Sequence, residues 1–315
     1  MRRIGIVLHP TRSDPAVFDR FAATQGDADV EVLGLARDAD RLPPWAHIVD
    51  DTTFAARVDA VVSLGGDGTM LGAMRLVAAR PVPVLGVNFG HLGFLVEIMP
   101  TELDDALVRL EQGRFVIEDH HGLRVTPPGG VEVVAFNDVV LSRERGTSVV
   151  ADLALGENRY GYYRCDAVVV ATPHGSTAYN FAAGGPVVSP AASVCVVTPV
   201  APMSGISRTI VLDGSEQLRL TTAADGPEIP VEIDGTDGGR LAPGETVTVE
   251  LVPRAGQVIR LDPARHAARN RVKLSLQDLP LRQDQLLELV PPELRPGQRS
   301  TGGPGEAARE GGDGG

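Results

Sequence analysis

The first third of the chain alternates apolar runs of strand length with amphipathic segments of helical spacing. The apolar runs cover residues 3–9, 29–35, 59–65 and 81–88. The amphipathic segments cover residues 14–24, 69–79 and 101–113. In the second segment Met70, Leu71, Met74 and Val77 share one helical face, and Gly113 ends the third as a C-cap. Buried strands that alternate with helices predict a parallel sheet covered on both faces.

From about Phe115 the pattern changes to short β segments joined by Gly, Pro, Asp and Asn. These segments cover residues 131–141, 148–155, 162–171, 217–222, 229–235, 246–252 and 257–261. Such spacing predicts mostly antiparallel β structure. Near residue 264 the pattern becomes helical or mixed again.

These changes divide the chain into four parts. Residues 1–114 form an α/β domain, residues 115–262 a β domain, residues 263–290 a segment that packs back onto the first domain, and residues 291–315 a tail. The tail is rich in Gly, Pro and charged residues, so it cannot bury enough apolar surface to offset its ordering entropy. We therefore expect it to be disordered.

Composition and charge limit the cellular setting and the partners. The formal charge is −12, which argues against a general nucleic-acid binder, because such a protein needs a basic face for phosphates. No apolar run approaches the ~20 residues that span a bilayer, and the first residues lack the features of a signal peptide. Cys165 and Cys195 lie in Val-rich segments and read as buried, reduced thiols. We expect a cytoplasmic protein with no membrane partner.

The segment VVSLGGDGTM places three glycines and one carboxylate between a buried strand and a helix. A loop in this position lies at the carboxyl end of a parallel strand, which is the edge of an open α/β sheet where ligands bind. The backbone amides of Gly65, Gly66, Gly68 and Thr69, together with the positive end of the helix, suit a polyphosphate. Asp67 would repel phosphate, so it has another purpose: to accept a proton from an attacking hydroxyl, or to hold a divalent metal.

The predicted phosphate site contains none of the lysines that bind phosphate in P-loop proteins and protein kinases. Lys273 is the single lysine, which excludes both the P-loop and the Val-Ala-Ile-Lys strand of protein kinases.

A second candidate ligand loop follows the apolar run 167–171. Thr172, Ser176 and Thr177 offer hydroxyls there, Gly175 permits close approach, and Tyr179 offers an aromatic face with a polar tip.

Taken together, the two loops resemble those of NAD kinases, which phosphorylate the adenosine ribose of NAD at its 2′-hydroxyl. The resemblance extends to about residue 285. It rests on GGDGT (65–69), GVNFGHLGFL (86–95), FNDVVL (136–141), RCDAVVVATPHGSTAYNFAAGGP (164–186) and VEIDG (231–235). It implies an N-terminal Rossmann-like α/β domain, a C-terminal β-sandwich that binds NAD, and a homo-oligomer, either a dimer or a tetramer.

The resemblance also implies roles for individual residues. Asp67 would accept the proton of the 2′-hydroxyl, with Gly68 lining the same site. Asn137 and Asp138 match a pair that holds the adenosine part, and Arg164 and Asp166 match an Arg-x-Asp pair. The segment that would wrap the dinucleotide comprises Thr177, Ala178, Tyr179, Asn180, Phe181 and Ala182. The donor would be ATP or polyphosphate, with a divalent cation such as Mg²⁺ bridging phosphate oxygens.

Four positions depart from the family pattern. His174 stands where a small hydroxyl residue is usual, and we expect it to be a loop histidine whose ring has its hydrogen bonds. Met203 and Thr209 replace a histidine and a proline, and Thr236 replaces a frequent glutamine.

Two alternatives remain at this point. A lipid or sphingoid-base kinase of the same superfamily would share the glycine turn but would have no use for the Thr-Ala-Tyr loop. A catalytically silent NAD(P)-binding regulator would keep the fold and bind the dinucleotide without turnover.

Overall fold

The computed structural model describes residues 2–12, 14–25, 30–89 and 93–276. Residues 1–266 form one compact unit and residues 267–315 form another, and the description below concerns the first. The expected tail, residues 277–290 and positions 90–92 of the second matched segment lie outside the described residues. The packing of residues 263–290 and the proposed domain boundaries stay predictions.

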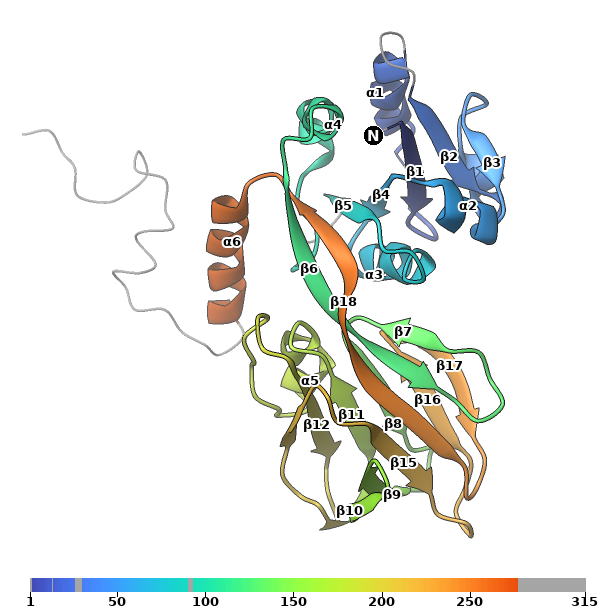
Figure 1. The fold of residues 1–315 in the computed structure, drawn as a ribbon, viewed down its shortest axis with the longest axis vertical. Coiled ribbons are helices and arrows are strands. Elements are labelled where there is room, and N and C mark those ends of the chain that lie inside the picture. The colour runs from blue at the N-terminus through green and yellow to red at the C-terminus, as the bar shows by residue number, and fades with distance from the viewer. Residues whose placement is uncertain (1, 13, 26–29, 90–92, 277–315) are drawn as a thin grey trace, which may run out of the picture. The chain divides into compact units, whose positions relative to one another are not determined.

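The N-terminal part is a parallel sheet with the strand order β3-β2-β1-β4-β5 (Figure 1). Its strands are β1 (Arg3–Leu8), β2 (Glu31–Leu35), β3 (His47–Val49), β4 (Ala60–Gly65) and β5 (Pro83–Asn88). Its helices are α1 (Ala16–Gln25), α2 (Asp51–Arg57), α3 (Asp67–Leu76) and α4 (Leu103–Glu111), with 3₁₀ turns at Ala36–Arg41 and Pro100–Glu102. The predicted parallel α/β architecture is confirmed.

Successive side chains of a strand point to opposite faces of the sheet, and in β1, β4 and β5 most of them are apolar and buried. Both faces of the sheet are therefore covered by helices. On one face Ile4 and Ile6 pack with Phe21 of α1 and Leu107 of α4. On the other face Val61 and its neighbours pack with α2 and with the apolar side of α3. The four residues expected on the inner side of α3 are all buried: Met70, Leu71, Met74 and Val77.

The C-terminal part is mainly antiparallel β structure. One six-stranded sheet has the order β14-β12-β11-β8-β16-β17. Its strands are β8 (Asp138–Ser142), β11 (Ala167–Ala171), β12 (Val194–Val200), β14 (Ile210–Asp213), β16 (Ile229–Ile233) and β17 (Thr236–Leu241). The facing strands are β6 (Val116–Thr126), β7 (Val133–Ala135), β9 (Val149–Leu155), β10 (Asn158–Cys165), β13 (Ser204–Gly205), β15 (Leu218–Thr222) and β18 (Thr246–Arg260). Side chains of both layers form one apolar core, as expected of a sandwich.

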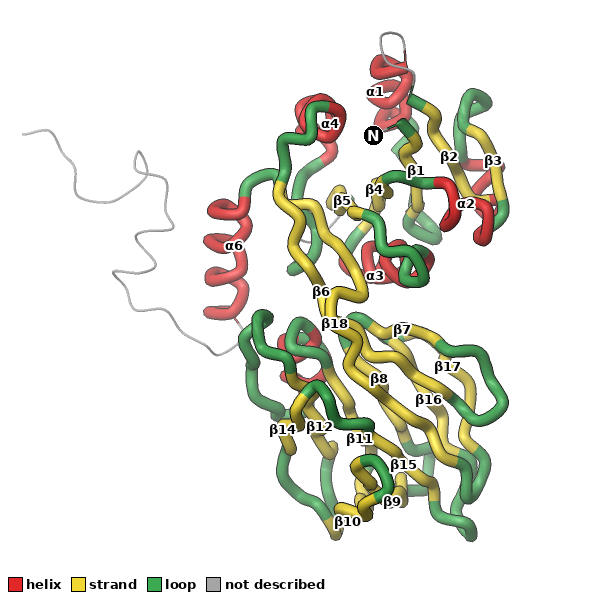
Figure 2. Tube along the Cα trace, in the orientation of Figure 1, coloured by secondary structure: helices red, strands yellow, loops and turns green. Residues whose placement is uncertain are grey.

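The long strand β18 joins the two parts (Figure 2). It pairs antiparallel with β15 and β6, and near Gln257 and Val258 it also pairs in parallel with β5. A single twelve-stranded sheet therefore runs through both parts. The two segments predicted at 246–252 and 257–261 are one strand, with an irregularity between Val252 and Gly256 that looked like a loop in the sequence.

Helix α6 (Pro263–Leu276) follows β18. Within the described part of the chain, no helix is both long and apolar enough to cross a membrane. Cys165 and Cys195 are free and buried, as expected.

Candidate functional site

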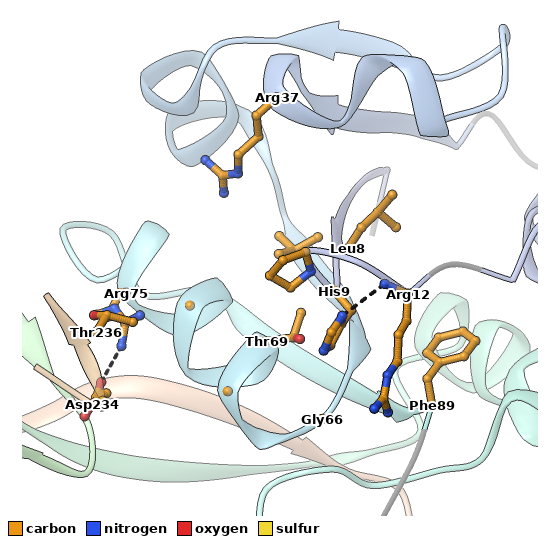
Figure 3. A pocket seen from close by; sticks show the side chains of 15 residues that line it. Leu8, His9, Arg12, Arg37, Gly66, Thr69, Arg75, Phe89, Asp234 and Thr236 are labelled. Carbon is orange, nitrogen blue, oxygen red and sulfur yellow. Dashed lines mark hydrogen bonds and ion pairs between the residues drawn. The ribbon is translucent and has the colours of Figure 1, made fainter.

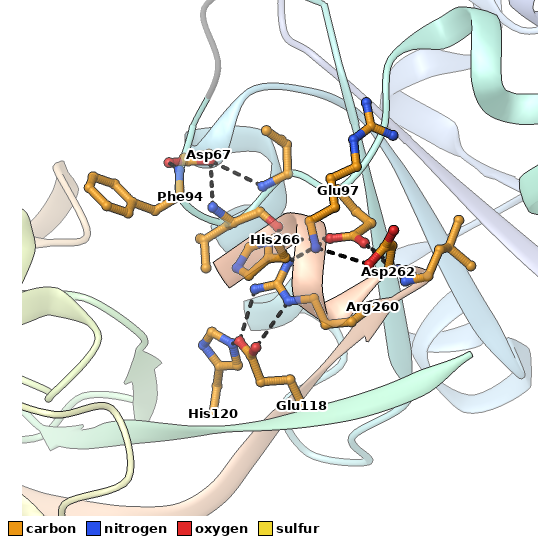
Figure 4. Close-up of polar contacts among 12 residues, drawn as sticks. Asp67, Phe94, Glu97, Glu118, His120, Arg260, Asp262 and His266 are labelled. Carbon is orange, nitrogen blue, oxygen red and sulfur yellow. Dashed lines mark hydrogen bonds and ion pairs between the residues drawn. The ribbon is translucent and has the colours of Figure 1, made fainter. Parts of the chain in front are cut away.

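Asp67 is the first residue of α3, at the carboxyl end of β4. Its carboxylate accepts hydrogen bonds from three successive backbone amides: Phe94 N to Oδ2 at 2.6 Å, and Leu95 N and Val96 N to Oδ1 at 3.0 and 3.4 Å (Figure 4). Three of the roughly four acceptor positions of a carboxylate are thus used, and one on Oδ2 remains. The segment after β5 therefore holds Asp67 in one orientation and leaves it able to accept a proton.

Gly93 allows this close approach. A Cβ atom at this position would lie 1.8 Å from Oδ1 of Asp67, which no real contact permits. The sequence analysis assigned this segment to the family pattern without giving Gly93 a role.

A pocket of about 540 Å³ lies beside the glycine turn (Figure 3). Its lining includes Gly66, Gly68 and Thr69 at the start of α3, three of the four residues for which phosphate binding is a prediction. The positive end of a ten-residue helix faces the pocket, so an anion is favoured there.

Three arginines from separate elements also line this pocket: Arg12, Arg37 and Arg75. Arg37 is paired with Asp51 at 2.7 Å, and Arg75 with Asp234 at 2.7 Å. None of the three was predicted from the sequence. The available signal was that Arg12 and Arg37 follow shortly after the carboxyl ends of two parallel strands, which is the edge where ligands bind.

Asp234 is a buried acceptor that connects several parts of the site. Its carboxylate accepts N–H bonds from Phe136, Asn137 and Asp138 at 2.6–3.2 Å, besides the ion pair with Arg75. Its side chain is fully buried, and its backbone adopts a φ of 47°. Asp234 belongs to the matched segment VEIDG, but no role was predicted for it.

The turn that carries Asn137 and Asp138 contacts the second candidate loop. Thr172 N donates to the carbonyl of Asn137 at 2.9 Å, and a Cβ on Gly175 would lie 1.9 Å from that carbonyl oxygen. The backbone N–H of Tyr179 lies near the carboxyl group of Asp138 and lowers its pKa. The structure therefore brings these two predicted segments together.

Asp138 is a buried acid with an unusual titration. Burial, followed by the nearby charge of Asp234, raises the pKa of Asp138 to about 7. The carboxyl group thus changes protonation near neutral pH.

The hydroxyls of the second loop donate to carbonyl groups of the protein. Thr172 donates to the carbonyl of Phe136, Ser176 to that of Pro173, and Thr177 to that of His174. These bonds satisfy loop carbonyls that would otherwise be buried without a partner. The hydroxyl residues shape the loop.

Asn180 is also turned inward. Its amide donates to the carbonyls of Ser176 and Pro186 and accepts from Thr198, and the residue is fully buried. Tyr179 is 42% exposed and presents its ring at the surface. Of the side chains in this segment, Tyr179 is therefore the best placed to meet a ligand.

Arg164 and Asp166 lie apart from these groups. Arg164 lies on β10 and Asp166 directly precedes β11, whereas Thr172 follows the end of β11. Six residues of extended chain correspond to about 20 Å, so the pair is distant from the loop of its own chain. Asp166 is paired with Arg143 at 2.7 Å.

His174 stacks on His120, with ring centroids 3.7 Å apart and planes inclined by 19°. Its Nδ1 is buried and has no hydrogen-bond partner among the described residues, so the expectation of a satisfied ring is wrong. Burial, followed by the nearby imidazole of His120, lowers the pKa of His174 to about 3. A neutral imidazole needs only one of its nitrogens protonated, which allows this arrangement.

Glu118, His120 and His174 have ligand atoms within 4.8 Å of one another, which raises the question of a metal site. Two observations argue against it. A metal bound to an imidazole lies close to the ring plane, and two nearly parallel rings 3.7 Å apart cannot both contain it. The Glu118 oxygen that faces His120 also accepts a bond from Arg260 at 2.9 Å. We therefore describe the group as a hydrogen-bonded cluster.

The other three residues that depart from the family pattern are Thr236, Thr209 and Met203, and only Thr236 lines the pocket. The Thr236 hydroxyl donates to the carbonyl of Ile233 at 2.7 Å. The hydroxyl of Thr209 lies 3.1 Å from that of Thr198, and Met203 is exposed.

Comparisons with known proteins agree with this arrangement. The family model for the ATP-NAD kinase N-terminal domain matches residues 28–115, and that for the ATP-NAD kinase C-terminal domain matches residues 136–261. An NAD kinase of Moorella thermoacetica is 36% identical over 272 residues, which are 83% of this chain and 85% of that protein. An NAD kinase of Symbiobacterium thermophilum is 39% identical over 69% of this chain and 79% of that protein.

Solved structures share the fold. A yeast NADH kinase complexed with NADH matches with a TM-score of 0.79 at 20% identity, covering 90% of this chain and 89% of that one. An NAD kinase from Archaeoglobus fulgidus in complex with ATP matches with a TM-score of 0.65 at 24% identity, covering 87% and 99%. Both family models and the curated relatives agree with the motifs and the two-part fold, and the chain belongs to the NAD kinase family.

Proposed function

We propose that this protein is an NAD kinase that transfers a phosphoryl group from ATP or polyphosphate to the 2′-hydroxyl of the adenosine ribose of NAD. The observation that carries the proposal is the placement of Asp67. It begins α3 beside an arginine-lined pocket, and it keeps an acceptor position on a carboxylate that three amides orient.

The arginine-lined pocket is the proposed site of the phosphoryl donor. Amides at the start of α3 and the guanidinium groups of Arg12, Arg37 and Arg75 would contact phosphate oxygens. Arginine offers a planar set of donors that fits phosphate geometry, so the pocket does not need a lysine. A volume of about 540 Å³ is adequate for a nucleoside triphosphate or a short polyphosphate.

The proposed acceptor site lies along the turn 136–138 and the segment 177–182. Asn137 and Asp138 would bind the adenosine ribose, and Tyr179 would stack on a ring of the dinucleotide. We assign Thr177, Ala178, Phe181 and Ala182 to the wall of this site. The inward amide of Asn180 supports a role in loop shape, so we assign it no direct side-chain contact.

Asp67 would act as the general base. Its free acceptor position on Oδ2 can take the proton of the attacking hydroxyl as the oxygen–phosphorus bond forms. Backbone amides hold the carboxylate before the reaction, so little reorganisation is needed at the transition state.

A divalent cation would be held mainly by the phosphate oxygens of the donor and by water, as Mg²⁺ commonly is in phosphoryl-transfer sites. Asp234 already has Arg75 and three amides as partners, and the open position of Asp67 is assigned to the proton, so we assign neither carboxylate to the cation. When bound, the cation would neutralise charge on the phosphate oxygens.

We also propose a cytoplasmic homo-oligomer. The roles that the resemblance gives Arg164 and Asp166 favour a second copy, because the pair lies about 20 Å along the chain from the acceptor loop of its own copy. Exposed aromatic residues on the same strand, Tyr160 and Tyr162, are consistent with a contact surface. The two reduced cysteines agree with a reducing compartment.

The decisive experiment incubates the purified full chain with NAD and either ATP or polyphosphate, with and without Mg²⁺, and identifies the product by mass. Formation of NADP supports the proposal. Phosphorylation of diacylglycerol or of a sphingoid base instead would support the lipid-kinase alternative. Dinucleotide binding without any phosphorylated product would support a silent regulator.

A further inference from the structure

A buried ionic cluster lies beneath the segment that holds Asp67 (Figure 4). It consists of Glu97, Glu118, His120, Arg260 and His266, and His174 stacks on its edge. Arg260 stands at the end of β18 and is only 2% exposed. None of the functions assigned above explains why a cation is buried here.

Arg260 contacts the Asp67-binding segment directly. Its Nη1 donates to the carbonyl of Leu95 at 2.7 Å, while the N–H of the same residue donates to Asp67 at 3.0 Å. Leu95 is therefore held by hydrogen bonds on both sides, to Arg260 through its carbonyl and to Asp67 through its amide.

The other nitrogens of Arg260 fix the guanidinium plane. Nε and Nη2 donate to the two oxygens of Glu118 at 3.1 and 2.9 Å, and Nη1 also lies 3.4 Å from Glu97. Burial opposes the ionisation of Glu118, but hydrogen bonds from His120 and Arg260 outweigh it and hold its pKa well below the ordinary value. The bidentate contact therefore involves an ionised carboxylate, which is the strong form of this pair.

The same cluster reaches the dinucleotide loop. His120 Nε2 lies 2.7 Å from Glu118, and the His120 ring stacks on that of His174, in the loop that follows β11. A continuous set of contacts thus runs from Asp67 through Leu95, Arg260, Glu118 and His120 to His174.

Stability alone is a weak reason for such a group, because a buried ion pair is often no better than apolar residues of the same size. Arg260 can instead orient its neighbours. Its Nη1 binds the carbonyl of Leu95, beside the proposed base, while Glu118 fixes the other two nitrogens. We propose that Arg260 is a positioning residue, which fixes the 94–96 amides and thereby the orientation of Asp67. This inference rests on the proposed function of Asp67.

The test uses Arg260→Lys, which keeps the charge but cannot make all three contacts at once. Its matched control is Arg254→Lys on the same strand, where the side chain is 80% exposed. We expect kcat for NADP formation to fall about 10- to 100-fold in Arg260→Lys, with KM for NAD and for ATP within about threefold of the original, because a misplaced base affects the reacting geometry rather than binding. Arg254→Lys should behave as the parent protein.

A readout that does not depend on activity is hydrogen exchange at residues 94–96. These amides should exchange at least about tenfold faster in Arg260→Lys, while amides of the core strand β4 exchange at the original rate. Should the lysine variant fail to fold, Glu118→Gln loosens the guanidinium without removing it, and smaller changes in the same direction are expected.

The outcomes separate the two proposals. A parent protein that forms no NADP refutes the proposed function. In that case the exchange rates of the 94–96 amides in Arg260→Lys still test whether Arg260 positions this segment. A parent protein that forms NADP, together with an Arg260→Lys variant of unchanged kcat and unchanged exchange at 94–96, overturns the inference. Faster exchange in all core strands alike would also overturn it, because it would show a general loss of stability.

Discussion

The guanidinium of Arg75 lies 2.7 Å from the carboxylate of Asp234, and this pair joins the helix that starts with Asp67 to the turn that carries Asn137 and Asp138. The proposed base and the proposed acceptor site belong to parts of the chain about seventy residues apart. The Arg75–Asp234 pair therefore sets one of the distances on which phosphoryl transfer depends.

We expect Arg75→Met to be strongly destabilising. Asp234 is fully buried, so removing its cationic partner leaves a buried charge that three amides satisfy only in part. Losses of about 3–5 kcal/mol are typical when one partner of a buried pair is removed. Urea denaturation measures the free energy of unfolding. The control, Arg159→Met, breaks an exposed pair with Asp152 and should cost less than about 1 kcal/mol. Equal losses in the two variants would contradict this role of Asp234.

Replacing Asp67 by Asn should remove most turnover and leave NAD binding nearly intact. A positioned general base contributes on the order of 10²–10⁴ in rate, and the amide side chain cannot take a proton. Initial rates of NADP formation and a calorimetric titration with NAD measure the two effects. Asp152→Asn, in which the replaced side chain is about half exposed, is the matched control. Full turnover in Asp67→Asn would refute the assignment of the base.

The raised pKa of Asp138 predicts that increasing pH lowers the stability of the folded protein and raises its affinity for NAD. Its folded pKa of about 7 lies above the ordinary value of 3.8, so the folded chain binds this proton more tightly than the unfolded chain. The contribution of Asp138 to stability is therefore complete below about pH 4 and declines as pH rises to about 7. The affinity for NAD should instead increase through this range, because the ionised carboxylate is the better acceptor for ribose hydroxyls.

Denaturation and NAD titrations at several pH values, with the parent protein and Asp138→Asn, measure both trends. The variant should lose the pH dependence of NAD binding above about pH 6. A variant whose binding still strengthens to the same extent would show that another group is responsible.

Tyr179→Ala should weaken NAD binding without a matching loss of kcat. Stacking of a base on an aromatic ring contributes about 1–3 kcal/mol, which corresponds to a rise of roughly 5- to 150-fold in KM for NAD. Val211→Ala provides the control, since that side chain is exposed on the edge strand β14. A KM unchanged in Tyr179→Ala would place the dinucleotide elsewhere.

Much of the fold was predictable because its signals are local. Apolar runs that alternate with helical periodicity predicted β1, β2, β4, β5 and the helices α1, α3 and α4, and Gly113 ends the α4 region with a φ of 68°, as a C-cap glycine should. The three-residue strand β3 and the short helix α2 were missed, because each is shorter than the window over which periodicity can be read.

The site was predictable in its positions more than in its contacts. Asp67 and the 137–138 turn could be found from short motifs with a family resemblance. The direction of each side chain could not, because partners can be far away in the sequence: the Thr172 hydroxyl donates to the carbonyl of Phe136, 36 residues earlier. Asp234 and Arg260 were missed for the same reason: their partners lie roughly 100–160 residues away.

Strand β18 has a mechanical consequence. Because β18 pairs with strands of both the parallel and the antiparallel regions, bending between these regions would break interstrand hydrogen bonds in both. A hinge motion that closes the parallel region onto the antiparallel region is therefore costly. The distance between the proposed donor and acceptor sites is then set when the protein folds. Exclusion of water during the reaction must then come from the loops around the gap or from a neighbouring copy.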